Sequence, residues 1–573
     1  MATIKDSLDE PVLIPSISPS VTDDELQGLS LYEQKCVLIN REMDSNGMGR
    51  YQWSIWLLCG FGYFIDLLWA QAFGLVLRPL QQELGIPGAC SKLLNIGVLS
   101  TKHFWIANQS GNISTAFSAG LTAGAFTWGV LVDIIGWCSG HEIVPSRRWA
   151  FNLTCLISAA FGLGLGACDS YTSFLVVTAF CGFGIGGNIP IDTTICLEFL
   201  PQNRRFLLVL LSLFQPIGVV ICSVIAYGFI PPYSCSPNFV EPNPAPSCRD
   251  VPTGTPCCTR ASNMGWRYLM FTLGAITLSI FFLRFVVFNF QESPKFLVYR
   301  GKDQKAIEVL QKIAKFNKRQ SSLTIEDFSS LRVDSADHSA AGLLGAGDEQ
   351  ETLSFWGKFK LEFSRYGMLF SSKSATYLTI LVWLTYIMDF WGFTLAGGYL
   401  PSIIAAKNVV INRDLKHTYR SYVYIYLPGI VGVLLGGAMY KVPAIGRKWS
   451  MVISSALMGI SIFLFSAANS NASNIGLNVM EYFFQSMFNA ILYGWTPEQF
   501  PTAIRGTACG IAAFWGRLFG IVAPQIAQHL LPSTSKPTAD DYAKVLYLAG
   551  GITLGCVVTT ALLPNKMLNR QSM

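Results

Sequence analysis

The sequence contains few charged residues. Asp, Glu, Lys and Arg make up 13% of the 573 residues, whereas hydrophobic residues make up 51%. A soluble globular chain carries about 25% charged residues. The shortage therefore excludes a soluble globular protein of this length. The net charge of +6 is modest and forms no basic stripe with interleaved aromatic residues, so we expect no nucleic-acid partner.

Several chemical signatures are also missing. The chain has five His, none paired at metal-ligand spacing, and no nucleophile stands beside a candidate base. It contains no Gly-Lys-Ser/Thr phosphate loop. No apolar core precedes Trp53, so we expect no cleavable signal peptide. These absences predict no metal, no cofactor and no enzymatic activity, and they argue against an ATP-driven pump.

What the sequence does contain is about a dozen long apolar stretches. A membrane-spanning helix needs roughly 20 mostly apolar residues, and only helices and closed barrels satisfy the backbone in lipid. These stretches are too long for barrel strands. We therefore predict an all-α membrane protein with twelve transmembrane helices, at residues 53–80, 111–136, 149–167, 171–198, 206–230, 266–290, 376–400, 421–442, 449–468, 475–497, 507–530 and 543–563.

Positive charges predict the orientation, because short loops rich in Lys and Arg stay in the cytosol. Four loops on one side carry such charges, against one positive loop, 401–420, on the other. Because four positive loops outnumber one, we predict that their side is the cytosolic side and that both termini lie there. We expect the plasma membrane rather than an internal one. The deciding charges are Arg147, Arg148, Arg204, Arg205, Arg447, Lys448 and Arg505.

Matched motifs predict that the chain is an internal repeat of two pseudo-symmetric six-helix bundles. Arg147 matches Arg447 and Glu198 matches Glu498 at one constant spacing. Earlier matches are spaced more widely, so residues 88–109 and 137–146 are extra in the first half. A mis-spliced intron would account for them.

The expected domain boundaries follow from the repeat. Between the halves lies a long connector, in which Asp303 to Asn317 has the apolar spacing of an amphipathic helix. We expect a cytosolic tail at 1–50, an N-terminal bundle at 51–290, a cytosolic connector at 291–375, a C-terminal bundle at 376–565 and a cytosolic tail at 566–573.

One predicted external loop is rich in cysteine. Cys235, Cys248, Cys257 and Cys258 follow the fifth span, on the side where disulfides survive. Four Cys allow three pairings, and the sequence does not choose among them. Free thiols or a metal site are the alternative, although the spacing is not that of a zinc site.

Carboxylates inside the predicted spans are the main functional candidates, because ionisable groups in lipid are expensive and usually functional. Asp66 and Asp389 occupy matching places in the two halves, and repeats of this kind enclose a site near the bilayer midplane. A carboxyl group in such a place can exchange a proton near neutral pH. The alternative is a structural ion pair, with Arg284 and Arg517 as candidate partners.

Other polar and aromatic residues of the spans extend this candidate cavity. Some of them would bind solute, and the alternative is hydrogen bonding or packing between helices. The full predicted set is Asp66, Trp69, Gln71, Asn188, Asp192, Gln215, Asp389, Trp391, Glu481 and Asn489.

Several sequence motifs resemble those of a known protein superfamily. Gly129-Val-Leu-Val-Asp133-Ile-Ile-Gly136 with Arg147-Arg148 resembles the loop signature of the major facilitator superfamily. Gly184-Ile-Gly-Gly-Asn188, followed by Glu198-Phe-Leu-Pro201, resembles its sugar-transporter-like branch. So do Glu292-Ser-Pro-Lys295 and Pro497-Glu498-Gln-Phe-Pro501. The chain is similar to the fungal and animal carriers related to the synaptic vesicle glycoprotein.

The resemblance implies charge networks that lock a cytosolic gate. Acidic and Arg side chains at helix ends would pair in one state and part in the other. The alternative is that the positive charges only mark topology. Carried over to this sequence, the network comprises Asp133, Arg147, Arg148, Glu198, Arg204, Arg205, Arg447, Glu498 and Arg505.

Departures from the family pattern bear on the substrate. Thr178 stands near the place of the family's Arg in span four, and Phe390 to Thr394 replaces the Gln-rich signature of hexose carriers. Phosphate carriers have Asp where Asn188 stands. These departures argue against hexose and against phosphate as the substrate. We expect a monomeric secondary carrier of a small organic solute, an organic anion or other metabolite, moved with protons across the bilayer. The alternative is a non-transporting sensor that signals through the connector.

Overall fold

The computed structural model describes residues 31–564 except for a set of gaps. The gaps are 86–110, 136–145, 242, 250, 253, 288–290, 300, 332–365, 412–413, 441, 443–445, 469, 501–504 and 532–538. Residues 88–109 and 137–145 of the two extra segments therefore lie outside the described residues. The chain divides into two compact units. The first comprises Met1–Tyr51 and Ser293–Gly347, and the second comprises Gln52–Glu292 and Asp348–Ser572.

The first unit is a small helical assembly. Its helices are α2 (Leu31–Asn46), α11 (Pro294–Tyr299), α12 (Asp303–Phe316) and α13 (Ile325–Ser329). The predicted amphipathic helix is confirmed as α12, which buries Ile307, Leu310 and Ile313 on one face. The Ser322 hydroxyl of the connector donates to Oε2 of Glu42 on α2 at 2.9 Å. The N-terminal helix and the connector thus fold together.

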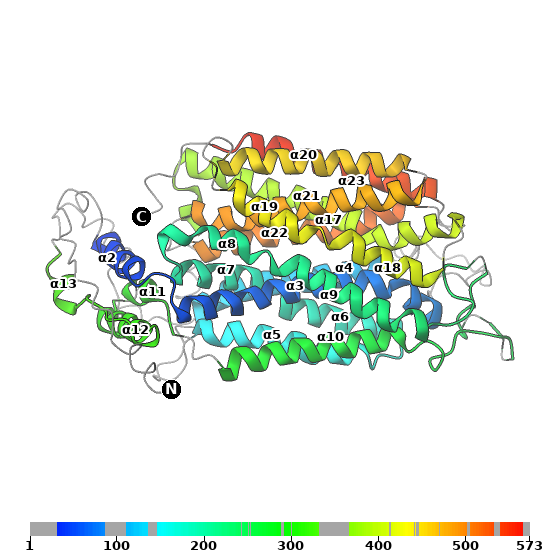
Figure 1. The fold of residues 1–573 in the computed structure, drawn as a ribbon, viewed down its shortest axis with the longest axis horizontal. Helices are drawn as coiled ribbons and strands as arrows, with labels where there is room; N and C mark the ends of the chain where they lie inside the picture. Colours follow the sequence, from blue (N-terminus) through cyan, green and yellow to red (C-terminus); the bar gives the residue numbers. More distant parts are fainter. Residues whose placement is uncertain are drawn as a thin grey trace, which may run out of the picture. The chain divides into compact units, whose positions relative to one another are not determined.

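The second unit consists of helices that lie side by side along a common direction (Figure 1). Its first half contains α3 (Arg50–Leu84), α4 (Asn112–Ile135), α5 (Ser146–Leu165), α6 (Tyr171–Ile185), α7 (Asn188–Phe199), α8 (Phe206–Leu211), α9 (Phe214–Phe229) and α10 (Gly265–Phe282). Its second half contains α17 (Lys373–Ile411), α18 (Leu415–Tyr426), α19 (Gly429–Met439), α20 (Gly446–Ala467), α21 (Asn471–Trp495), α22 (Arg505–Leu530) and α23 (Ala539–Ala561).

Each of the twelve predicted spans corresponds to a helix or to two consecutive helices. One such break, between α18 and α19, falls at Pro428, which has no backbone N–H to donate within a helix. Among the described residues, nine of these helical segments are long and apolar enough to cross a membrane. The prediction of an all-α membrane protein is confirmed.

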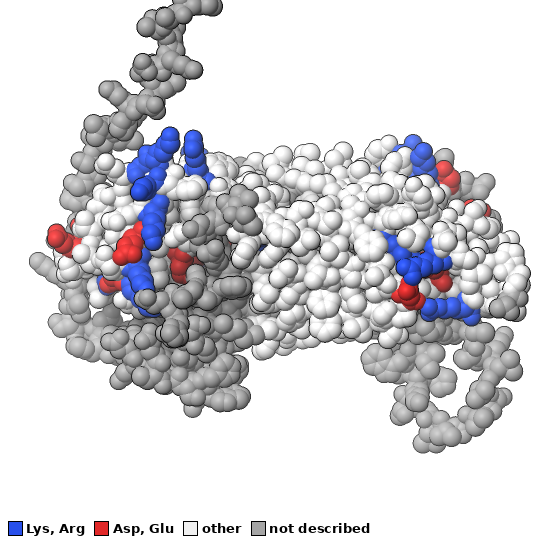
Figure 2. Space-filling view, turned by 90° about the horizontal axis from the view of Figure 1, so that it is seen from below, with Lys and Arg blue, Asp and Glu red and all other residues white. Residues whose placement is uncertain are grey.

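The outer face of the second unit is apolar. Figure 2 shows a wide band of this face without charged side chains. Large hydrophobic side chains lie exposed along the helices, including Phe126, Phe180, Leu464 and Val558. Water does not tolerate a continuous apolar surface of this size, whereas lipid does. The band is therefore the surface that contacts the bilayer.

Glycine allows α4 and α6 to touch through their backbones. A Cβ atom on Gly120 would lie 2.0 Å from the carbonyl oxygen of Ala179, and one on Gly186 would lie 2.4 Å from that of Leu121. Small residues are the usual means of close helix approach in membranes. The contact ties these two helices of the first half together.

Candidate functional site

An arginine of the second half contacts an aspartate of the first half. Arg517 on α22 lies with its Nη2 3.4 Å from Oδ1 of Asp66 on α3, and both side chains are buried. Nη1 of Arg517 donates to the carbonyl oxygens of Gly186 and Leu121. A single guanidinium thus binds α3, α4 and the junction between α6 and α7.

A cavity surrounds this ion pair. Its empty volume is about 1060 Å³, and helices of both halves contribute to its lining. A mainly apolar lining with a few polar groups is typical of sites that bind small organic molecules. The lining comprises Asp66, Leu67, Ala70, Gln71, Phe73, Gly74, Ser114, Phe117, Ser118, Leu121, Val219, Phe390, Phe393, Thr394, Gly397, Gly398, Leu400, Tyr426, Glu481, Tyr482, Gln485, Arg517 and Gly520.

Three of the predicted cavity residues line the cavity: Asp66, Gln71 and Glu481. The Glu481 side chain is 7% exposed, and none of the described residues makes a hydrogen bond or ion pair with its carboxylate. Asp66 is instead paired with Arg517. The cavity therefore contains one compensated and one uncompensated carboxylate.

Asp192 forms a buried ion pair with Arg284. Its Oδ2 accepts from Nη2 of Arg284 at 3.1 Å, and both side chains are fully buried in the first half. Arg284 also donates to the carbonyl oxygen of Leu58 at 2.8 Å. A Cβ on Gly62 would lie 1.6 Å from the same Asp192 oxygen, so glycine there makes room for the carboxylate. Asp192 does not line the cavity.

Asp389 pairs with an amide rather than with a cation. With its nitrogen facing the carboxylate, the Asn489 side chain donates to Oδ2 of Asp389 at 2.9 Å and to Oδ1 at 3.2 Å. Asp389 on α17 and Asn489 on α21 both belong to the second half. Neither residue lines the cavity. Asp389 and Asp66 therefore have different surroundings despite their matching places in the repeat.

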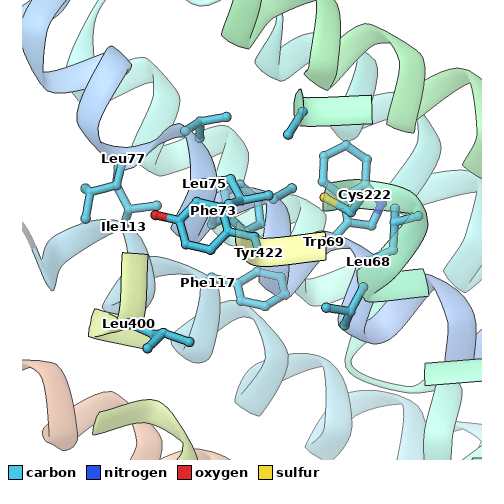
Figure 3. Close-up of a cluster of buried hydrophobic side chains, with 14 of the residues drawn as sticks. Leu68, Trp69, Phe73, Leu75, Leu77, Ile113, Phe117, Cys222, Leu400 and Tyr422 are labelled. Atoms are coloured by element: carbon cyan, nitrogen blue, oxygen red, sulfur yellow. The ribbon is translucent and has the colours of Figure 1, made fainter. Parts of the chain in front are cut away.

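The two predicted tryptophans also lie outside the cavity lining. Trp69 donates from Nε1 to Oγ1 of Thr277 at 3.1 Å, and Figure 3 shows it with Leu68 and Cys222 in a buried hydrophobic cluster. The ring of Trp391 packs against that of Phe519, with centroids 5.8 Å apart. These side chains pack between helices, as the alternative interpretation held.

The remaining polar candidates, Asn188 and Gln215, are buried but do not line the cavity. Next to Asn188, however, Ile189 and Pro190 line a second cavity, with an empty volume of about 330 Å³. Phe390 and Arg517 are common to both cavities. Arg517 therefore lines both cavities.

Contacts between the halves flank the cavity along the helices. Toward the end where α9 finishes, which we call the disulfide end, Tyr419 donates to the carbonyl oxygen of Leu75 at 2.8 Å. There Gln525 also donates to Thr115 at 2.9 Å. Toward the opposite end, the rings of Tyr63 and Tyr493 meet with centroids 6.4 Å apart.

The second-half members of the predicted gate network come together at that opposite end. Glu498 lies 2.7 Å from Arg447 and accepts from the Tyr440 hydroxyl at 2.6 Å. Burial, and then the charge of Glu498, raise the pKa of the Tyr440 phenol well above its usual range. Tyr440 therefore remains a donor. Arg505 donates from Nε to the carbonyl oxygen of Pro497 at 2.7 Å, in the short helical turn that also carries Glu498.

The first-half members of the network are only partly described. Glu198 is buried, whereas Arg204 is exposed and Arg205 is half-buried. The side chains of Asp133, Arg147 and Arg148 lie outside the described residues. The first-half network thus stays a prediction.

Sequence reasoning missed a buried charge cluster at the disulfide end. Glu83 lies 2.8 Å from Arg267 and accepts from the indole N–H of Trp266 at 2.9 Å. Its carbonyl oxygen accepts from the Ser247 hydroxyl in the cysteine-rich loop at 2.7 Å. The available signal was Arg267 at the very start of an apolar span, where it needs a buried acid.

The cysteine-rich loop contains two disulfides. Cys235 pairs with Cys258, and Cys248 pairs with Cys257. This selects one of the three pairings left open by the sequence. Free thiols or a metal site are excluded for these four residues. The described part of the chain contains no group of three His, Cys, Asp or Glu that would hold a metal ion.

Two six-helix halves around a central cavity, with an apolar outer band, define a membrane transporter of the major facilitator type. The family described as "Sugar (and other) transporter" matches residues 92–571, and the chain belongs to this family.

Comparisons with known proteins agree with that assignment. The chain is 34% identical to MFS siderochrome iron transporter 1 of Ceriporiopsis subvermispora, over 95% of this chain and 92% of that protein. It is 23% identical to the synaptic vesicle 2-related protein of Rattus norvegicus, over 97% and 83%. Among solved structures it resembles the proton:xylose symporter XylE, with a TM-score of 0.59 at 15% identity, over 90% and 96%. The resemblance to the sugar-transporter-like branch and to the synaptic vesicle group is confirmed.

Proposed function

We propose that this chain is a secondary carrier that moves a small organic solute with protons by alternating access. The observation that carries the proposal is the ion pair between Arg517 and Asp66, which joins the two halves inside the cavity. Protonation of Asp66 would remove the charge that Arg517 faces. The contact between the halves would weaken, and the halves would become free to rock.

The contacts that flank the cavity fit the same mechanism. Opening toward the disulfide end requires the Tyr419 and Gln525 bonds to break. Opening toward the other end requires Tyr63 and Tyr493 to separate. Alternating access breaks one set at a time while the other stays closed. Asp389, paired only with an amide, serves as the second proton-binding candidate.

The gate network belongs to the same proposal. Glu498, Arg447 and Tyr440 would stay together while the cavity is closed toward their end and part when it opens. Glu198, Arg204, Arg205 and Arg505 would act with them, together with Asp133, Arg147 and Arg148. These roles rest on the family resemblance and on the position of the residues at helix ends.

The solute is proposed to be an organic anion or another metabolite. The name of the C. subvermispora relative refers to siderochrome iron, which fits a carrier role for small organic solutes. We further propose that the protein works as a monomer in the plasma membrane with both termini in the cytosol. The boundaries 1–50, 51–290, 291–375, 376–565 and 566–573 remain the proposed domains.

The test begins with a metabolite comparison between a deletion strain and its parent, which identifies the solute. Transport is then measured in proteoliposomes under an imposed pH gradient for Asp66→Asn and Asp389→Asn. We expect pH-driven transport to fail in both variants while the protein remains folded. The matched control is Glu241→Gln, because Glu241 is exposed in the cysteine-rich loop and its carboxylate binds only Asn238, outside the cavity.

Unimpaired pH-driven transport in both Asp66→Asn and Asp389→Asn would contradict the proton role. Solute counterflow in the wild-type protein separates a carrier from a sensor, because a sensor shows none.

A further inference from the structure

The Glu481 carboxylate stands in the cavity without a charge partner. It is carried by α21, is 7% exposed and lines the cavity. No described Lys, Arg or His lies within ion-pair distance of it. The other buried acid of the lining, Asp66, has Arg517 at 3.4 Å. Glu481 is thus the one acid among the described lining residues whose charge nothing offsets.

The lining as a whole therefore favours positive charge. The lining contains two carboxyl groups and one guanidinium, and its other residues are neutral at physiological pH. An ionised carboxylate removed from water is costly unless a cation or several hydrogen bonds compensate it. A solute that brings a positive charge to this place would supply the missing partner.

Aromatic rings beside Glu481 suit an organic cation better than a small inorganic one. The phenol groups of Tyr482 and Tyr426 both lie close enough to Glu481 to interact with its charge, and their rings meet edge to face, with centroids 4.7 Å apart. Both rings line the cavity, as do Phe73 and Phe117. The faces of aromatic rings attract weakly hydrated organic cations. A strongly hydrated metal ion would instead need several oxygen ligands.

A hydrogen-bond acceptor completes the arrangement. Gln485 lies one helical turn from Glu481 on α21, so both side chains share a face of that helix. Its side chain is buried and lines the cavity, and its oxygen has no hydrogen-bond partner among the described residues. This oxygen is buried, so a rotation of the Gln485 side chain would be needed before it could accept from an N–H or O–H group of a solute beside Glu481.

We infer that the transported solute carries an organic ammonium group, which binds between the Glu481 carboxylate and the rings of Tyr426 and Tyr482. The inference rests on the proposed carrier function and names the chemistry of its solute. Of the two classes proposed above, it selects a metabolite that bears a positive charge over a simple organic anion.

The experiment compares ammonium ions with neutral molecules of the same shape. Purified full-length protein is titrated with choline and with 3,3-dimethyl-1-butanol, in which carbon replaces the ammonium nitrogen. Tetramethylammonium and neopentyl alcohol form a second pair, and tert-butylammonium and tert-butyl alcohol a third. Binding is followed by the shift in thermal unfolding temperature at constant pH and ionic strength.

For at least one pair, we expect the ammonium ion to bind at least tenfold more tightly than its neutral counterpart. Glu481→Gln should reduce that preference to less than threefold, and Glu481→Asp should retain most of it. The control Glu241→Gln, at an exposed loop position where the carboxylate binds only Asn238, should behave as the wild type. The unfolding temperature without ligand shows that each variant is folded.

Two results would overturn the inference: equal affinity for the charged and neutral members of all three pairs, or a preference that survives in Glu481→Gln. Counterflow assays on the same preparations address the carrier proposal separately. Charge-selective binding with no counterflow of any solute would contradict the carrier function, whereas counterflow without charge-selective binding would contradict only the ammonium site.

Discussion

Arg517 on α22 reaches across the boundary between the two halves and lies 3.4 Å from Asp66 on α3. The same side chain donates to the backbone oxygens of Leu121 and Gly186. One residue therefore contacts Asp66 and joins the two halves at the cavity.

We expect transport to need the planar guanidinium group of Arg517, which reaches several acceptors at once. The variant Arg517→Lys tests this expectation. Lysine keeps the positive charge but cannot reach several acceptors with a rigid fork. We expect transport to fall at least tenfold, which corresponds to about 1.4 kcal/mol of activation free energy. Arg420→Lys, at an exposed position, should transport normally. Wild-type rates in Arg517→Lys would show that charge alone suffices.

The backbone contact between α4 and α6 predicts a stability effect. In Gly120→Ala, the new methyl group would lie 2.0 Å from the carbonyl oxygen of Ala179, and overpacking of this kind costs about 1–3 kcal/mol. We expect a lower unfolding temperature in detergent.

The matched control for this variant is Gly228→Ala, because nothing lies within 4 Å of the Cβ position there. It should leave the unfolding temperature unchanged or raise it slightly, since alanine is the better helix former. Equal effects of the two substitutions would contradict the packing argument.

The hydrogen bond from Tyr440 to Glu498 predicts the outcome of Tyr440→Phe. A bond to a charged acceptor contributes about 1.5–3 kcal/mol, so the free energy of unfolding should fall by that order. Tyr424→Phe, in which an exposed ring loses its hydroxyl, is the control. A loss no larger than that of the control would show that the bond contributes nothing to stability.

The same residue predicts a pH dependence with a definite sign. Because the phenol pKa is raised in the folded protein, the unfolded chain loses this proton first as the pH rises. The contribution of Tyr440 to stability is therefore constant below about pH 10 and falls above it. Chemical unfolding measured from about pH 7 to about pH 11 should show this loss in the wild type and less of it in Tyr440→Phe.

Much of the fold was predictable because lipid imposes a simple length rule. Each apolar stretch became a helix, and α12 was identified from its apolar spacing. The ion-pair partners Arg517 and Arg284 were also foreseeable, since a charge buried in a span needs an opposite charge nearby. Which acid each would bind was not, because that depends on how separate helices pack.

The rotation of each helix about its axis explains why some predicted cavity residues do not line the cavity. On α3, Ala70 lies on the same face as Asp66 and lines the cavity, whereas Trp69 points to Thr277. Neighbouring positions on a helix differ by about 100° around its axis. Closeness in sequence to a cavity acid therefore does not predict closeness in space.

The disulfide pairing needed the structure for a different reason. Cys257 and Cys258 are adjacent, so either could serve Cys235 as far as chain length is concerned. The contact of Ser247 with the end of α3 fixes the path of the loop, and that path decides the pairing. Glu83, which also lies at this end of α3, was missed because it falls beyond the predicted span.

Two of the acceptors that hold Arg517 are main-chain oxygens, and every amino acid carries the same main-chain oxygen. Substitution of Leu121 by another apolar residue would leave its acceptor in place. Gly186 is restricted by packing against α4 and not by this bond. Mutational damage to the bond between the halves is therefore concentrated at two positions, 517 and 66, and a saturation library of the chain should show its sharpest loss of transport there.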